Sequence, residues 1–207
     1  MVKSCPLRLE DPIITIVIPT KGRKTLKGTI QSLLDQSCGA WKALIVCDGF
    51  FPSNKCSDSR IKYIECSKLG INNNAGNVRN YGIGFVDTKW IGFVDDDDSL
   101  NKDYIKTLYG YDRTYDDIDI IIYTMVQDGR LIPSRWNNDI VLADIGISYA
   151  YKASWSLKGG YYFNQSGCED YDHVKRMSDG GAKYIIDRDI GYYVRPHGLE
   201  EYEDDLH

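Results

Sequence analysis

The segment from Ile13 to Ile18 consists of β-branched residues and is followed at once by Pro19. A strand that is apolar on both faces is typical of a parallel sheet covered by helices on either side. Strand and helix patterns then alternate along the first hundred residues. The expected elements are a helix that begins at about 26 and stops before Gly39, strands at 41–47 and 61–66, a helix at about 75–86, and a strand at 90–94. Residues 1–100 therefore predict a doubly wound α/β half.

Beyond residue 100 the pattern is less regular. The expected elements are a helix at 101–111, a strand at 118–126, a helix at 169–177, and short strands at 184–186 and 192–194. We predict one domain over residues 1–207, with a smaller second half at 101–199. The acidic stretch 200–207 suits a tail or a linker to further protein.

Composition excludes several classes of protein. The chain has 207 residues, of which 43% are hydrophobic, and a net charge of −5, so a broad positive surface for nucleic acid is not expected. The apolar run at 13–18 is far shorter than the roughly 18 residues of a spanning helix. We therefore expect no membrane span, no signal peptide and a cytoplasmic location. The cysteines show no metal-binding spacing and are expected to be reduced.

Polar residues follow three of the expected strands. Thr20 and Arg23 come after the first strand, Asp48 after the second, and the run Asp95–Asp98 after the fourth. Ligands of open α/β sheets bind beyond the carboxyl ends of the strands, so these loops are expected to meet at one rim.

The aspartate run indicates a divalent cation, because neighbouring carboxylates repel one another unless a cation offsets their charge. Oxygen ligands suit Mn²⁺ or Mg²⁺, which bind through one or two carboxylates together with substrate phosphates. The alternative is a solvated loop in which Asp98 or Ser99 caps the next helix. The position of the run at a strand end favours a metal and diphosphate site.

Several motifs, in order, resemble the family-2 glycosyltransferases, which have the GT-A fold. Residues 16–20 resemble the opening strand of the family, and 46–49 its second-strand motif, although Cys47 replaces a common acidic residue. Residues 77–82 resemble the A-R-N-x-G helix, and 95–97 the D-x-D motif. Gly167-Cys168-Glu169-Asp170 resembles the motif that supplies the catalytic base.

The resemblance implies a GT-A fold with a mostly parallel central sheet, in which 1–100 binds a nucleotide sugar and 101–199 binds the acceptor. It assigns Asp170 as the general base, with Glu169 and Asp172 as rivals. The residues that it implies for the donor are Pro19, Thr20, Arg23, Asp48, Arg79, Asp95 and Asp96; those for the metal are Asp97, Asp95 and His197. Without the resemblance, Arg79 would be interpreted as a surface cation and Asp170 as a helix cap.

The implied reaction is metal-dependent transfer of a hexosyl or deoxyhexosyl group from a nucleoside-diphosphate sugar, with UDP favoured, to a glycan or glycoprotein hydroxyl. A single base predicts inversion at the anomeric carbon. Trp155 is a candidate for stacking on the acceptor. The chain also resembles amino-terminal domains of glycosyltransferases of large algal viruses, which implies a viral capsid protein as acceptor and the host cytoplasm as location.

Two rival functions remain open from the sequence. Residues 95–100 also resemble the D-x-D loop of haloacid-dehalogenase-type phosphatases, although that loop follows their first strand. A non-catalytic sugar-nucleotide-binding module would keep the same donor residues and lack only the function of Asp170.

Overall fold

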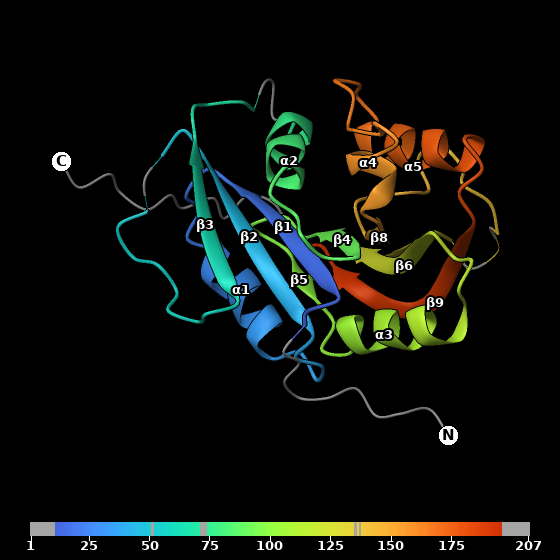
Figure 1. Ribbon diagram of the computed structural model, residues 1–207, viewed down its shortest axis with the longest axis horizontal. Coiled ribbons are helices and arrows are strands. Elements are labelled where there is room, and N and C mark those ends of the chain that lie inside the picture. Colours follow the sequence, from blue (N-terminus) through green and yellow to red (C-terminus); the bar gives the residue numbers. More distant parts are fainter. Residues whose placement is uncertain (1–10, 51, 71–73, 135, 137, 196–207) are drawn as a thin grey trace.

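The computed structural model describes residues 11–50, 52–70, 74–134, 136 and 138–195 (Figure 1). The strands are β1 (Ile14–Thr20), β2 (Trp41–Asp48), β3 (Ile61–Cys66), β4 (Trp90–Phe93), β5 (Ser99–Leu100), β6 (Ile120–Gln127), β7 (Arg130–Ile132), β8 (Tyr149–Lys152) and β9 (Tyr184–Tyr193). The helices are α1 (Leu26–Leu34), α2 (Gly76–Ile83), α3 (Tyr104–Thr114), α4 (Ser154–Leu157) and α5 (Glu169–Asp179). The expected tail 200–207 and His197 lie outside the described residues.

The strands of the described residues form one sheet in the order β3-β2-β1-β4-β8-β6-β9-β5, with β7 paired to β6. The first four strands pair in parallel. The second half is mixed, because β8 runs antiparallel to both β4 and β6 whereas β9 runs parallel to β6. The predicted α/β fold is confirmed, with the parallel pairing concentrated in the first half.

Helices cover both faces of the sheet, with α2, α4 and α5 along one side and α1 and α3 along the other (Figure 1). The chain moves outward from β1 through β2 to β3 and then returns to place β4 on the other side of β1. The order of strands therefore reverses between β1 and β4. A crevice at the carboxyl ends of these two strands is the expected ligand site of such a sheet.

The core lies against β1, which is buried along its whole length. Helix α2 approaches this strand closely at Gly82, where an added Cβ would lie 2.6 Å from Val17 Cγ1 and 2.9 Å from Val46 Cγ2. A larger residue at 82 would push α2 away from the sheet. This close packing fixes the position of Arg79, one turn earlier on the same helix.

The last strand differs from the prediction. Two short strands were expected at 184–186 and 192–194, but β9 is continuous from Tyr184 to Tyr193. Its register against β6 shifts on either side of Thr124, which pairs with Ile190 while the preceding Tyr123 pairs with Asp187. These irregularities place Arg188 and Asp189 outside the regular ladder and break the apolar pattern that identifies a strand.

Two expectations from composition can be checked on the described residues. Cys47, Cys56, Cys66 and Cys168 are free thiols. Cys38 is disulfide-bonded, so the prediction that every cysteine is reduced is wrong there. None of the helices in the described part of the chain has the length and apolar content needed to cross a bilayer.

Candidate functional site

The carboxyl ends of β1, β2 and β4 meet at one pocket of about 460 Å³. Each predicted catalytic, donor or metal residue in the described part of the chain lines this pocket, whereas His197 is outside the described residues. These residues are Pro19, Thr20, Arg23, Asp48, Arg79, Asp95, Asp96, Asp97 and Asp170. The pocket also includes Lys21, Gly70 and Glu169, which were not on the donor list. Lys21 could have been found from its place directly after Thr20.

Asp96 joins the loop after β4 to the loop after β1. Its carboxylate accepts hydrogen bonds from Thr20 Oγ1 at 2.6 Å and from Arg23 Nη1 at 2.9 Å, and only 4% of the residue is exposed. Burial raises the pKa of Asp96, while Thr20 and Arg23 act in the opposite direction. Asp96 therefore fixes the shape of the pocket floor, and its contact with a donor stays a prediction.

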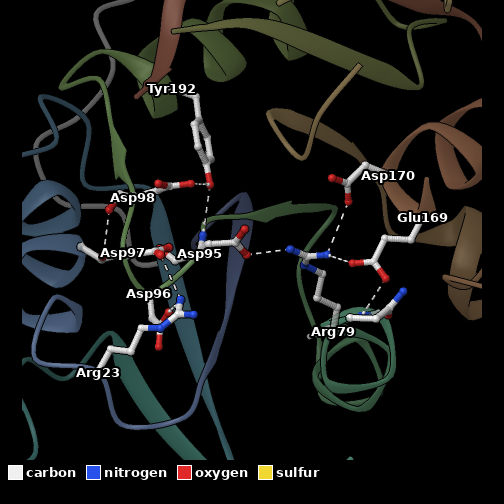
Figure 2. Close-up of polar contacts among 12 residues, drawn as sticks. Arg23, Arg79, Asp95, Asp96, Asp97, Asp98, Glu169, Asp170 and Tyr192 are labelled. Atoms are coloured by element: carbon white, nitrogen blue, oxygen red, sulfur yellow. Dashed lines mark hydrogen bonds and ion pairs between the residues drawn. The ribbon is translucent and has the colours of Figure 1, made fainter. Parts of the chain in front are cut away.

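Asp98 does not line the pocket, and its carboxylate binds residues of the second half. It accepts a hydrogen bond from the Tyr192 hydroxyl at 2.7 Å (Figure 2). It accepts another from the Arg195 backbone N–H at 3.0 Å. Burial, with Asp95 close by, raises the pKa of Asp98 to about 7. The alternative interpretation, in which Asp98 or Ser99 caps the next helix, is wrong, since α3 begins only at Tyr104 with Asp103 as its N-cap.

Within the run 95–98, Asp95 and Asp97 are the pocket aspartates with the more exposed side chains, at 33% and 13% against 5% for Asp96. Asp97 is paired with Arg23 Nη1 at 2.9 Å, and Asp95 with Arg79 Nη2 at 2.6 Å. The described residues contain no group of three or more His, Cys, Asp or Glu placed to hold a metal ion. Two carboxylates at one pocket nevertheless fit a Mn²⁺ or Mg²⁺ ion that is also held by substrate phosphates, because these ions seldom use an all-protein cage.

Asp48, at the end of β2, fixes the segment that leads to α2. Its carboxylate accepts hydrogen bonds from the backbone N–H groups of Leu69 and Gly70. A Cβ at Gly70 would lie 2.7 Å from Asp48 Oδ2, so only glycine allows this approach. Asp48 is thereby held at the rim where the resemblance places the nucleoside.

Arg79 is buried between the two halves and bridges their acidic groups (Figure 2). Its Nη1 donates to Glu169 at 2.6 Å and lies 3.4 Å from Asp170 Oδ1, while Nη2 donates to Asp95. Burial would lower the pKa of Arg79, but the three carboxylates more than offset this and raise it. The interpretation as a surface cation is wrong, because only 3% of the residue is exposed.

Glu169 and Asp170 open α5, where the helix dipole favours negative charge. Both oxygens of Glu169 are engaged, one by Arg79 and the other by the Gly76 backbone N–H at 3.2 Å. Among the described residues, the Asp170 carboxylate has only the long Arg79 contact, and 26% of its side chain is exposed. Burial raises the pKa of Asp170 to about 7, with Arg79 acting in the opposite direction and Asp95 and Glu169 adding to the rise.

A neutral histidine supports the helix that carries Asp170. His173 is fully buried, and burial lowers its pKa to about 3. Its Nε2 lies 3.2 Å from the Tyr161 carbonyl oxygen, so the proton is on Nε2 and Nδ1 accepts from the Tyr149 hydroxyl at 2.7 Å. Sequence reasoning missed His173, whose role is to fix α5 against the sheet.

Two further candidates lie apart from this pocket. Trp155 packs edge to face against Tyr161, with ring centroids 5.2 Å apart, and does not line the pocket. Asp172, the second rival for the base, does not line it either. Of these three carboxylates, Asp170 lines the pocket and has the longest contact with Arg79, and its assignment as the base stays a prediction.

Comparison with known sequences identifies the family. The profile described as glycosyl transferase family 2 matches residues 15–165, which is more than half of the chain. The chain belongs to this family. The match includes the aspartate run, so the phosphatase alternative loses its basis, whereas Asp170 lies just beyond the matched segment.

A curated relative, glycosyltransferase GlyA of Streptococcus pneumoniae serotype 4, is 29% identical over 109 residues. Those residues are 49% of this chain and only 15% of GlyA.

Solved structures share the GT-A glycosyltransferase fold. S. aureus TarS 1–349 in complex with UDP-GlcNAc has a TM-score of 0.70 at 17% identity, over 90% of this chain and 60% of that one. The mannosyltransferase PcManGT from Pyrobaculum calidifontis, in complex with GDP-Man and Mn²⁺, has a TM-score of 0.67 at 12% identity, over 95% and 61%. The family 2 domain therefore spans less than two thirds of the length of either structure.

Proposed function

We propose that this domain is a metal-dependent, inverting glycosyltransferase. It transfers a hexosyl or deoxyhexosyl group from a nucleoside-diphosphate sugar, with UDP as the favoured carrier, to a hydroxyl of a glycan or glycoprotein. The observation that carries the proposal is one pocket in which Asp95, Asp97 and Arg23 face Asp170 across Arg79. The GDP-Man, UDP-GlcNAc and Mn²⁺ complexes of proteins with this fold support it.

Different residues of the pocket would bind the nucleoside, the diphosphate and the metal. Asp48 and Thr20 lie at the rim where the nucleoside would sit, and Lys21 and Arg23 bring positive charge to the diphosphate. Asp95 and Asp97 would hold a divalent cation, which supplies charge stabilisation to the departing nucleoside diphosphate. The proposal includes His197, which is outside the described residues, as a further ligand of this cation.

Asp170 acts on the acceptor. The acceptor oxygen attacks the anomeric carbon as the bond from that carbon to the diphosphate oxygen breaks, and its electron pair leaves with the nucleoside diphosphate. The acceptor proton moves to the Asp170 carboxylate. One displacement inverts the configuration, and the other carboxylates that line the pocket are engaged. Arg79 binds Asp95 and Glu169, Arg23 binds Asp96 and Asp97, and the Leu69 backbone N–H binds Asp48.

The test is a transfer assay with UDP- and GDP-sugars, in Mn²⁺, in Mg²⁺ and in chelator. We expect metal-dependent release of nucleoside diphosphate, and NMR of the product should show the inverted anomer. The capsid glycoprotein of a large algal virus is one acceptor to include, with the host cytoplasm as the expected location. Binding without turnover of any donor would favour the non-catalytic module, and a retained anomer would refute inversion.

A further inference from the structure

A second cavity of about 610 Å³ adjoins the donor pocket. It lies between the start of α2, the segment at 143–145 and the segment at 165–171. The two cavities share Asn74, Glu169 and Asp170. A molecule in the second cavity can therefore bring an atom to the same carboxylate that faces the donor pocket.

The cavities differ in charge. Lys21, Arg23 and Arg79 line the donor pocket, which suits a diphosphate. Among the described residues that line the second cavity there is neither lysine nor arginine, and its carboxylates are Glu169 and Asp170. A phosphate or carboxylate group placed there would face two acidic side chains. Arg79 pairs with both of them, but this single guanidinium also binds Asp95 and does not line the second cavity.

The other lining groups suit hydroxyls. Gln165 and Asn77 supply amides, which both donate and accept hydrogen bonds. The Ser166 hydroxyl is buried and has no hydrogen-bond partner among the described residues. Ala143 and Ile145 add an apolar wall of the kind that packs against the C–H groups of a sugar ring.

We infer that the second cavity receives the acceptor as an uncharged, hydroxyl-rich saccharide, and that it discriminates against acceptors with a phosphate or carboxylate on the reacting sugar. This inference rests on the proposed function and adds the class of substrate. The separation of charge between the two cavities also keeps the diphosphate out of the acceptor position. The second cavity thus selects its acceptor both by repelling charged sugars and by hydrogen bonding to the hydroxyls of neutral ones.

The experiment compares matched pairs of acceptors: methyl glucoside, galactoside and mannoside, each beside the corresponding uronate and 6-phosphate. Donor hydrolysis by water, without acceptor, is measured in parallel and reports on the proposed function alone. We expect at least one neutral glycoside to accelerate donor consumption, with a kcat/KM at least about tenfold above those of its charged counterparts. If the donor is hydrolysed but no neutral glycoside accelerates it, or if a charged acceptor matches its neutral partner, the inference is overturned and the proposed function stands. Absence of donor hydrolysis and transfer would instead refute both.

A substitution in the cavity sharpens the test. Gln165 is exposed, so a lysine there adds a cation at small cost to folding. Gln165→Lys should raise the ratio of charged to neutral acceptor use by about fivefold or more, while Gln165→Met, which removes the amide without adding charge, should leave that ratio within about twofold. An unchanged ratio in Gln165→Lys would show that charge in this cavity does not select the acceptor.

Discussion

The two acidic segments that meet at Arg79 differ in how firmly the fold holds them. After β4, Asp96 is fixed by Thr20 and Arg23, and Asp98 by Tyr192. At the start of α5, Glu169 is bound on both oxygens, but Asp170 has one contact at 3.4 Å. Adjacent acidic residues therefore divide into those that shape the site and those left available for chemistry. A base needs such freedom, because its oxygen must accept the acceptor proton.

The largest effect is expected from Asp170→Asn. It removes the proposed base without changing side-chain size, so kcat should fall by about 10² to 10⁴. Donor affinity, measured by calorimetry, should change by less than about threefold, because transition-state interactions are the ones removed. The matched control is Asp172→Asn on the same helix, which should leave kcat within about threefold. A variant at 170 that keeps more than a tenth of the activity would remove Asp170 as the base.

Replacing Arg79, whose guanidinium bridges the two acidic segments, is expected to lower the free energy of unfolding. Arg79→Met leaves Asp95 and Glu169 without their shared partner, and an uncompensated buried charge costs about 3–5 kcal/mol in the free energy of unfolding. Urea denaturation measures this loss, and Arg79→Lys should recover part of it. Lys42→Met, which breaks the exposed pair with Asp87, should cost at most about 1 kcal/mol. Equal losses in Arg79→Met and Lys42→Met would contradict the bridging role.

The pH dependence of kcat/KM is expected to follow the ionisation of the Asp170 carboxyl. Because burial raises the pKa of Asp170 to about 7, its reactive carboxylate form is the minor one below that pH. The kcat/KM should therefore rise with pH through about 7, and fall about tenfold per unit on the acid side. The slope should disappear from the residual activity of Asp170→Asn. A slope that persists in that variant belongs to another group.

The smallest effect is expected from Asp98→Asn. The amide can keep one of the hydrogen bonds to Tyr192 and Arg195, so the loss of stability should be about 0.5–1.5 kcal/mol. Activity should stay within about threefold of wild type, since Asp98 does not line the donor pocket. A loss of activity as large as that of a pocket aspartate would place Asp98 in the chemistry.

Much of the first half could be predicted because its strands are buried on both faces and its strand ends are polar. Thr20, Asp48 and Asp95 are far apart in sequence but converge, since parallel strands end at one edge. The direction of each side chain within a loop could not be predicted. Sequence reasoning therefore assigned Asp96 to the donor without seeing that Thr20 and Arg23 bind its carboxylate.

The second half was harder for a different reason. Strand β8 has only four residues, and no strand was predicted there, although its aromatic residues Tyr149 and Tyr151 are typical of a core. Both tyrosines are buried, and His173 and Ser156 provide partners for their hydroxyls. Those partners come from other elements, so the local sequence does not predict this packing. The second cavity depends on the same long-range packing.

The most direct test of the account is calorimetric titration of a UDP-sugar and a GDP-sugar into wild type and Asp97→Ala, each with Mn²⁺ and with chelator. We predict that wild type binds one of the two nucleotide sugars only in the presence of the metal, and that Asp97→Ala binds neither detectably. Binding that is equally strong in chelator and in Asp97→Ala would contradict a metal at this pocket, and no binding of either nucleotide by wild type would contradict the donor site itself.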